Sequence, residues 1–292
     1  MSDGTADARS FHTLSPSQQQ EFLGLLPALI VIAERAGDEL KERFPGRTDG
    51  LEVKFKGERD LVTAADLASE SLILERLATL TPHVPILSEE RSDAAQTTES
   101  TEALWIVDPL DGTTNFTHGY PLYSVSIALT FGGEPILAVV HAPEFGETWS
   151  AALGRGTVRN GRNCSVSGEP KLLNALLATG FSYGRIELES GGLELFADLL
   201  QTAREIRRGG SACLDLAYVS SGVFAGFWEA DLKPHDVAAG ALLIREAGGV
   251  VTDYSGQDQW LYGRSIVAGN PTIHRLLLDA IARRDLDVGE SA

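Results

Sequence analysis

The segment from residue 104 to residue 116 carries the strongest chemical signal in the sequence. Its apolar first part ends in Asp108 and Asp111, two carboxylates that are three residues apart on a tight turn. Buried carboxylates are costly, and two neighbouring ones repel each other, unless a cation compensates their charge. Because Mg²⁺ takes oxygen ligands, Asp108, Asp111 and the carbonyl of Leu110 form a chemically sensible partial shell for this ion.

Gly112, Thr113 and Thr114 follow this pair and are predicted to open a short helix. The free backbone N–H groups at the start of a helix, with the positive end of its dipole, would bind a phosphate beside the metal without Lys or Arg. An isolated Asp-Gly pair is usually only a turn, with Pro109 ending the strand before it. The complete segment favours a joint metal and phosphate site over that simpler interpretation.

The elements that must position this segment are predicted from the spacing of apolar residues. Helices are expected at residues 15–44 and 63–80, and Pro27 indicates a kink or a later start in the first of them. Strands are expected at 51–56, 84–87, 104–107, 123–130, 135–141 and 148–152, with turns at 132–133 and 159–161. The second half alternates strands at 172–180, 205–208, 224–229, 250–253 and 266–268 with helices at 193–203, 211–221, 236–246 and 272–284.

This order of elements predicts an α/β protein, more closely an α+β layered sandwich with a mixed sheet. We expect a flexible tail at residues 1–14. An N-terminal α+β sub-domain at 15–165 would carry most of the metal ligands, and a C-terminal α/β sub-domain at 166–292 would complete the site. The two would form one catalytic unit.

Composition limits the partners of the chain. Its 292 residues include 41 acidic and 24 basic side chains, for a net charge of -17. So acidic a surface disfavours nucleic acid and anionic membranes as partners. The two cysteines, Cys164 and Cys213, show no metal-binding spacing and favour a reducing compartment. The N-terminal segment lacks the pattern of a signal peptide, so we expect a cytoplasmic protein.

The chemical segment and four further blocks together resemble the inositol monophosphatase family. The resemblance covers the chain from about Lys54 to Gly269. Five blocks in the expected order are far more specific than any one of them. The blocks are residues 56–66, 86–90, 108–116, 210–212 and 228–240. The resemblance implies the sugar phosphatase-like fold of that family, in which helix and sheet layers alternate, and a homodimer.

The resemblance also implies how the metals are held. A first Mg²⁺ would be bound by Glu89, Asp108, the Leu110 carbonyl and Asp111. A second would be bound by Asp108, Asp111 and Asp236, and Glu89 would anchor a more loosely bound third ion. The cofactor is therefore two to three Mg²⁺ ions per site.

Catalytic and substrate-binding roles follow from the same resemblance. Thr113, hydrogen-bonded to Asp66, would orient a metal-activated water and help to deprotonate it, and Glu89 would act with them. The ester would be a small polyol or sugar phosphate, most closely myo-inositol monophosphate. Substrate contacts are implied for Glu89, Leu110, Asp111, Gly112, Thr113, Gly210, Ser211, Ala212, Glu229 and Asp236.

Several of these residues have simpler interpretations. Asp66 could be solvated on a helix face, and Glu89 could belong to a charged loop. Asp236 could act as the N-cap of the next helix, either alone or in addition to binding metal. Ser211 is interpreted first as the cap of a helix start.

One position departs from the family pattern. His235 stands where many members have tryptophan, and we expect it to pack or to hydrogen-bond behind the ligands rather than to line the pocket. Cys213 is expected to be a small core residue. Arg185, Arg207 and Arg208 are candidate contacts for a second phosphate.

Two alternatives to an inositol phosphatase stay open. Related phosphatases act on nucleotide 3′-phosphates, fructose 1,6-bisphosphate or histidinol phosphate. A protein of another class could keep the fold only to bind a sugar phosphate or a protein partner. The presence of every acidic position named above favours catalysis.

Overall fold

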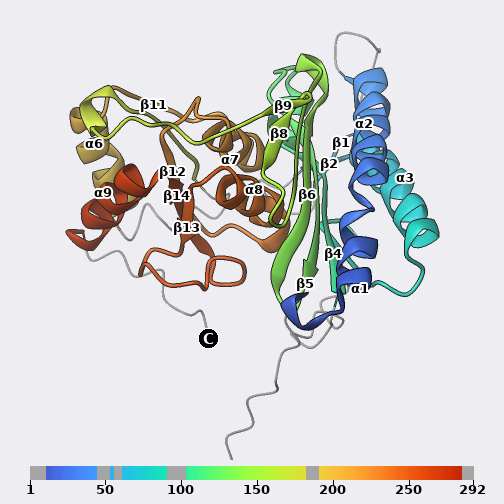
Figure 1. Cartoon of the computed structure of the whole chain (residues 1–292). Coiled ribbons are helices and arrows are strands. Elements are labelled where there is room, and N and C mark those ends of the chain that lie inside the picture. The colour runs from blue at the N-terminus through green and yellow to red at the C-terminus, as the bar shows by residue number, and fades with distance from the viewer. Residues whose placement is uncertain (1–10, 45–52, 56–60, 91–102, 182–190, 285–292) are drawn as a thin grey trace, which may run out of the picture.

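Helical and sheet layers alternate across the molecule in the order helix, sheet, helix, sheet, helix (Figure 1). The computed structural model describes residues 11–44, 53–55, 61–90, 103–181 and 191–284. One outer helix layer, an inner layer between the sheets and a second outer layer can be distinguished. In that order they contain α2 (Leu26–Arg43) with α3 (Ala64–Leu80), α7 (Ala212–Ser220) with α8 (Pro234–Glu246), and α6 (Gly192–Thr202) with α9 (Pro271–Ala282).

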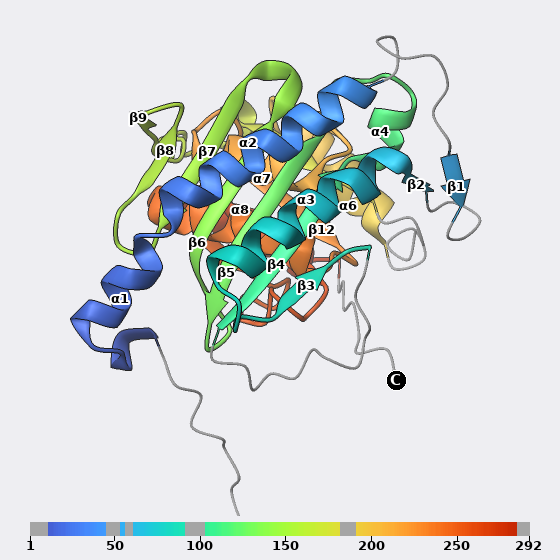
Figure 2. The same ribbon diagram turned by 90° about the vertical axis from the view of Figure 1, so that its right-hand side faces the viewer.

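The larger sheet has seven strands in the order β3-β4-β5-β6-β7-β8-β9. Only β3 and β4 are parallel, and the remaining neighbours are antiparallel. Figure 2 shows α2 and α3 lying across one face of this sheet. The strands are β3 (Ile86–Ser88), β4 (Ala103–Asp111), β5 (Ser124–Phe131), β6 (Glu134–Ala142), β7 (Glu147–Ala152), β8 (Thr157–Arg159) and β9 (Arg162–Asn163).

The smaller sheet has five strands in the order β11-β10-β12-β14-β13. β10 is parallel to both of its neighbours, whereas β14 is antiparallel to β12 and to β13. This mixture agrees with the predicted mixed sheet. The strands are β10 (Leu176–Thr179), β11 (Glu205–Arg207), β12 (Gly226–Ala230), β13 (Val250–Thr252) and β14 (Ser265–Gly269).

The inner helix α8 is apolar nearly all round because sheets lie on both sides of it. Small side chains let it approach α7 closely. A Cβ atom built on Gly240 would lie 2.5 Å from the Cβ of Leu216, so only glycine fits at this crossing. This agrees with the prediction that the small residues of the helix serve packing behind the site.

The short elements complete the chain. β1 (Val53–Phe55) and β2 (Leu61–Thr63) pair in an antiparallel two-stranded sheet, and β2 was not predicted. The predicted turn at 159–161 connects β8 and β9, and Gly132 and Gly133 have the positive φ that the β5–β6 turn requires. The described residues also form the short helices η1 (Phe11–Thr13), α1 (Pro16–Leu23), α4 (Thr113–Thr117), η2 (Pro143–Phe145) and η3 (Leu172–Asn174).

Two predictions near the N-terminus need correction. The single helix expected at 15–44 is two helices, α1 and α2, because Pro27 lacks an N–H and occupies the first turn of α2. The predicted tail ends before Phe11, whose ring is buried against Phe22 and Phe131. Residues 1–10 lie outside the described residues, and the division at residue 165 stays a prediction.

The strand expected at 172–180 begins instead as the 3-10 helix η3, and β10 starts only at Leu176.

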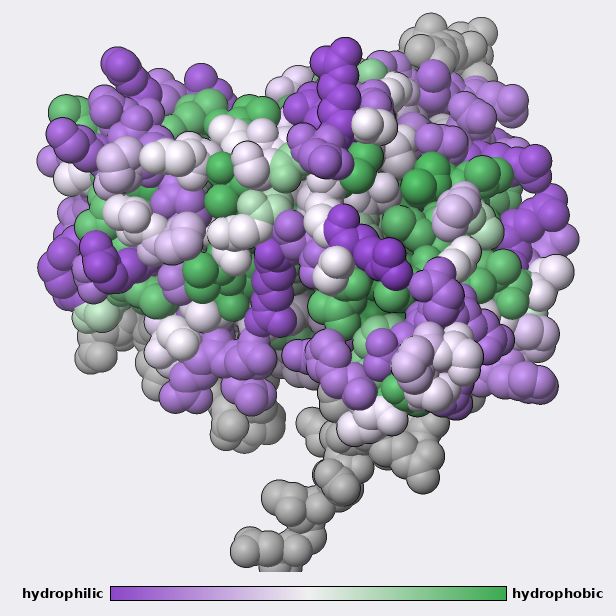
Figure 3. Space-filling model, viewed as in Figure 1, coloured by the Kyte–Doolittle hydropathy of each residue, from purple (hydrophilic) through white to green (hydrophobic). Residues whose placement is uncertain are grey.

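On the face that Figure 3 shows, hydrophilic residues predominate and apolar ones form small patches between them. Of the helices in the described ranges, none combines the length and the apolar character needed to cross a membrane. The α/β layered class that the sequence predicts is confirmed.

Candidate active site

The end of β4 places the predicted carboxylates. Asp108 pairs with Ser126 of β5 and Asp111 with Ser124, so the register shifts by one residue between them. This bulge re-aims the side chains at the end of the strand. Asp108 is 1 % exposed, and its Oδ1 accepts a hydrogen bond of 3.0 Å from the backbone N–H of Leu110.

Asp111 is held by donors from the other half of the chain. Its Oδ2 accepts hydrogen bonds from the hydroxyl of Ser211, from the backbone N–H of Cys213 at 2.9 Å and from the hydroxyl of Ser124 at 3.3 Å. The start of α7 therefore fixes the orientation of a carboxylate on β4. Ser211 occupies the N-cap position as predicted, but its side chain makes no cap hydrogen bond within the helix.

The phosphate-binding segment has the predicted helical form. Gly112 is the N-cap of α4 and has φ of +93°, which glycine adopts readily. Thr113 follows as the first residue of α4, and its hydroxyl lies 3.2 Å from the carbonyl oxygen of Leu110 and 3.5 Å from Oδ1 of Asp66. Asp66 is fully buried in the first turn of α3, so it is not a solvated surface residue.

Glu89 and Asp236 approach the same place from two further elements. Glu89 directly follows β3, and its backbone N–H donates to the carbonyl of Val107 at 3.2 Å. Asp236 is the third residue of α8, and its Oδ2 accepts a 2.6 Å hydrogen bond from the backbone N–H of Lys233. Lys233, not Asp236, is the N-cap residue, because the helix begins at Pro234.

Burial and mutual repulsion dominate the electrostatics of the site. Burial raises the pKa of Asp108 well above its ordinary value, and the charges of Glu89, Asp111 and Asp236 raise it further. Burial raises the pKa of Asp111 to about 6, although the hydroxyl of Ser211 acts in the opposite direction. The pKa of Asp236 is likewise raised by burial, to about 6. A cation among these groups would restore their ionised forms.

The wall opposite the phosphate-binding segment comes from the smaller sheet and the loop before α7. Glu229 of β12 is 7 % exposed, and its carboxylate fills the space in front of Gly180, where a Cβ atom would collide with it. Gly210 has φ of +82°, and the Asn115 side-chain amide lies against it. The side chain of Arg208 also lines this wall and donates to the carbonyl of Phe181 at 3.3 Å.

These walls enclose a cavity of about 560 Å³. Asp66 is not among its lining residues, and its Oδ1 lies 3.5 Å from the hydroxyl of Thr113, which does line the cavity. All other predicted site residues line it together: Glu89, Asp108, Leu110, Asp111, Gly112, Thr113, Gly210, Ser211, Ala212, Glu229 and Asp236.

The expectation for His235 was wrong in one respect. The residue is 7 % exposed, but it lines the cavity instead of only packing behind it. Cys213 is fully buried, as expected for a core residue, and its thiol donates to the carbonyl of Asp236 at 3.3 Å. Of the candidate second-phosphate contacts, Arg208 lines the cavity, Arg207 does not, and Arg185 lies outside the described residues.

Sequence reasoning gave no role to Asn115, Asp215 or Lys233, which also line the cavity. Asn115 stands within the quoted chemical segment, so its place in that motif was a usable signal. Asp215 and Lys233 had no such signal, since an Asp on a helix and a Lys before one are usually solvated.

Comparisons with known proteins agree with this geometry. A family model described as "Inositol monophosphatase family" matches residues 24–285. The inositol-1-monophosphatase of Mesorhizobium japonicum is 41% identical over 260 residues, which are 89% of this chain and 96% of that protein. A Pseudomonas aeruginosa protein named Nus factor SuhB is 42% identical over 251 residues, 85% of this chain and 93% of that one. The solved inositol monophosphatase from Anabaena (Nostoc) is 37% identical, with a TM-score of 0.80 over 91% of this chain and 97% of that chain.

Proposed function

Since the chain belongs to the inositol monophosphatase family, we propose that it hydrolyses small polyol phosphate monoesters, with myo-inositol monophosphate as the preferred substrate. One observation carries the proposal. Four carboxylates from three separate places in the chain converge on one cavity beside the start of α4: Glu89 after β3, Asp108 and Asp111 at the end of β4, and Asp236 at the start of α8.

The residues of the cavity fit a hard divalent cation. Three carboxylates raise the pKa of Asp108 in addition to burial, so the ionised cluster needs positive charge between its members. Glu89, Asp108, the Leu110 carbonyl and Asp111 would hold a first Mg²⁺, and Asp108, Asp111 and Asp236 a second. Bound ions of this kind lower the pKa of water and neutralise charge on a transferring phosphoryl group.

The protein groups around that position would orient the reactants. Thr113 lies between the Leu110 carbonyl and Asp66, so its hydroxyl can accept a hydrogen bond from the attacking water while it donates to a carboxylate. Asp66 is thereby placed to receive the proton from the water through Thr113. The backbone N–H groups of Gly112 and Thr113 would hold the phosphoryl oxygens and fix the direction of attack.

Polar groups on the other side of the cavity would select the alcohol part of the ester. Glu229 and Asp236 can accept hydrogen bonds from polyol hydroxyls, and the small side chain of Ala212 in the same lining leaves room for the substrate. Arg208 and Lys233 would add positive charge to a cavity that is otherwise acidic. Such a wall suits a compact hydroxylated substrate.

The experiment that tests the proposal is a substrate panel. Phosphate release from inositol 1-phosphate, a nucleotide 3′-phosphate, fructose 1,6-bisphosphate and histidinol phosphate would be measured with and without Mg²⁺. We expect Mg²⁺-dependent release that is fastest with inositol 1-phosphate and is inhibited by millimolar Li⁺. Dominant activity on another ester would replace the substrate, and metal-independent activity would contradict the proposal.

A role outside catalysis is the second candidate, because relatives named Nus factor SuhB match most of the chain. A purely binding protein would show no Mg²⁺-dependent turnover with any ester of the panel.

We also propose a homodimer, which size-exclusion chromatography with light scattering would distinguish from a monomer.

A further inference from the structure

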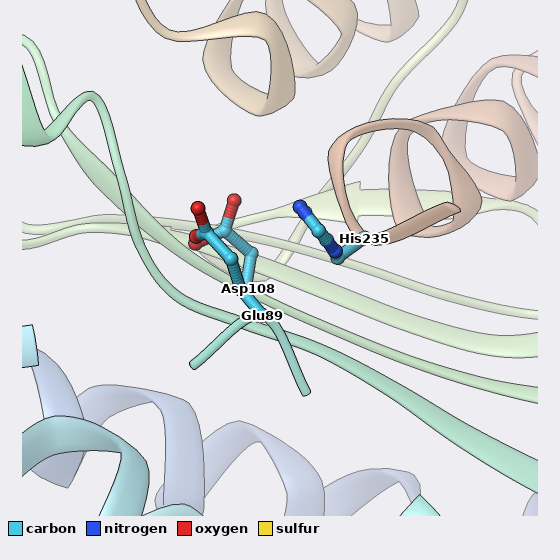
Figure 4. Close-up of side chains that lie close together, drawn as sticks. All are labelled: Glu89, Asp108 and His235. Carbon is cyan, nitrogen blue, oxygen red and sulfur yellow. The ribbon is translucent and has the colours of Figure 1, made fainter. Parts of the chain in front are cut away.

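An imidazole lies beside two of the carboxylates in the cavity. His235 is the second residue of α8, and Figure 4 shows its ring reaching from the start of that helix toward Glu89 and Asp108, with one ring nitrogen facing them. One ligand atom from each of the three residues lies within 4.8 Å of the other two. Nε2 of His235 is also 3.9 Å from Oδ1 of Asp236, which places a further carboxylate oxygen at the edge of the group.

Backbone contacts hold the three residues in place. The N–H of Glu89 donates to the carbonyl of Val107, and Asp108 lies within β4 with its Oδ1 fixed by the N–H of Leu110. His235 follows Pro234 at the beginning of α8, and its carbonyl accepts a contact of 3.7 Å from the thiol of Cys213. Asp108 and His235 therefore lie in regular elements, and the backbone of Glu89 is fixed directly after β3.

The spacing suits a single small cation. With metal–ligand bonds of about 2.0–2.2 Å, ligand atoms around one ion are separated by roughly 3–4.4 Å. The ligand atoms of Glu89, Asp108 and His235 all lie within 4.8 Å of one another, which is compatible with binding one ion between them.

The donor set differs from the all-oxygen site proposed above. Mg²⁺ takes oxygen ligands and keeps several of its waters, so an imidazole nitrogen adds little to its binding. Zn²⁺ is a borderline-soft ion that is commonly bound by histidine nitrogen together with carboxylate oxygen. A nitrogen beside two carboxylates therefore changes which metal the cavity prefers.

We propose that Glu89, Asp108 and His235 form a nitrogen-containing site that binds Zn²⁺ in preference to Mg²⁺. The site shares two carboxylates with the proposed magnesium site, so the two metals exclude each other. Resting on the proposed function, the consequence is that Zn²⁺ inhibits the phosphatase and that Mg²⁺ relieves the inhibition. A metal with affinity for nitrogen would thus regulate the activity through a residue that the hydrolysis itself does not require.

The test measures metal binding without substrate. Zn²⁺ affinity would be determined by competition with a chromophoric chelator for the wild type, His235→Phe and His235→Gln, each checked by thermal melting. We expect the Zn²⁺ affinity to fall at least tenfold in both variants, with a change below about threefold in Mg²⁺ affinity. His118→Phe is the control, because His118 is exposed and does not line the cavity. Equal Zn²⁺ affinity in the wild type and both His235 variants would overturn the proposal, as would an equal loss in the control.

Co²⁺ provides a second readout, because its visible absorption reports the ligands of a zinc-type site. We expect the wild-type Co²⁺ spectrum to change in both His235 variants and to stay the same in His118→Phe.

Failure of the zinc-site proposal and failure of the phosphatase proposal give different results. His235-dependent Zn²⁺ binding in a protein without Mg²⁺-dependent turnover would contradict the phosphatase alone, whereas normal turnover without such binding would contradict the zinc site alone.

Discussion

The side-chain amide of Asn115 donates to the carbonyl of Gly209 at 2.9 Å, across a sequence separation of 94 residues. The same nitrogen reaches the carbonyls of Leu122 at 2.6 Å and Gly210 at 3.4 Å. Asn115 belongs to α4, which carries the phosphate-binding segment, and the glycine loop precedes the start of α7. One amide therefore ties together the two walls of the cavity.

Replacing Asn115 by Ala should weaken both stability and activity. Partly buried carbonyl groups would lose their donor, which costs about 1 kcal/mol of unfolding free energy. The loop at Gly209 would also shift relative to α4, and misplacement by about 1 Å can lower turnover on the order of 100-fold. Urea unfolding and phosphate release would measure the two effects. Asn174→Ala is the control. Among the hydrogen bonds of the described residues, the exposed side-chain amide of Asn174 contacts only Glu169, at 3.3 Å. An equal effect of Asn174→Ala would contradict the role of Asn115 in joining the two cavity walls.

The chemical segment shows how far sequence reasoning reached. Asp108, Asp111, Gly112 and Thr113 are close in the chain, so their chemistry could be interpreted from spacing alone. The hydroxyl of Ser211 on Asp111 bridges a separation of 100 residues, and nothing in the local sequence indicates such a contact. Long-range partners of this kind depend on how the layers pack.

Boundaries of elements show the same limit. Five of the seven strands of the larger sheet were predicted, because helices cover both faces and the apolar runs are continuous. β8 and β9 were missed, and only the turn between them was predicted. β2 was missed because three residues carry no usable periodicity. The division of the helix at Gly24 depended on the position of Pro27, for which the sequence left both a kink and a later start open.

Asp108→Asn should abolish turnover and stabilise the metal-free protein. In the absence of metal, burial and three other carboxylates make the ionised form of Asp108 unfavourable, so a neutral amide at this position removes the cost of either ionising or protonating it. We expect a gain on the order of 1–2 kcal/mol in EDTA. With Mg²⁺ the wild type should gain stability and the variant should not, because a ligand is missing. Thermal melts in EDTA and in Mg²⁺ would measure this. Asp258→Asn, which removes an exposed partner of Arg245, should show neither effect, and a destabilised Asp108→Asn in EDTA would refute the account.

Mg²⁺ binding should release protons near pH 6. The pKa values of Asp111 and Asp236 are raised from 3.8 to about 6, so each is about half protonated at that pH and a cation must displace the protons. Apparent Mg²⁺ affinity should therefore increase from pH 5 to pH 7. Calorimetry at pH 6 in two buffers of different ionisation enthalpy would count the protons. A pH-independent affinity over this range would show that the carboxylates are already ionised without metal.

The same shifts predict the stability of the metal-free protein. A carboxyl group whose pKa is higher in the folded than in the unfolded chain binds more protons when folded, so rising pH destabilises the fold. For Asp111 and Asp236 the loss should begin near pH 3.8 and be complete a little above pH 6. In EDTA the contribution of Asp111 should therefore make the wild type more stable relative to Asp111→Asn at pH 5 than at pH 7. Urea unfolding of both proteins at the two pH values would measure the difference, and a difference of opposite sign would contradict the shifts.

Gly180→Ala should impair recognition of the alcohol part of the substrate more than the chemistry. A methyl group at residue 180 would collide with the carboxylate of Glu229, which must then leave its place in the cavity wall. If Glu229 binds polyol hydroxyls, the KM for inositol 1-phosphate should rise by roughly tenfold, as expected for the loss of a charged hydrogen bond. Hydrolysis of p-nitrophenyl phosphate, which has no such hydroxyls, should change much less. Gly168→Ala is the matched control, because a Cβ atom there would meet no atom within 4 Å.

A double-mutant cycle separates the displacement of Glu229 from a general effect on the fold. In Glu229→Ala the carboxylate is gone, so the added methyl group of Gly180→Ala has nothing to displace. The double variant should then have the same KM for inositol 1-phosphate as Glu229→Ala alone, which means strong non-additivity. Additive losses would show that residue 180 acts on the site by another route. They would also remove the support that this contact gives to Glu229 as the group that selects the polyol.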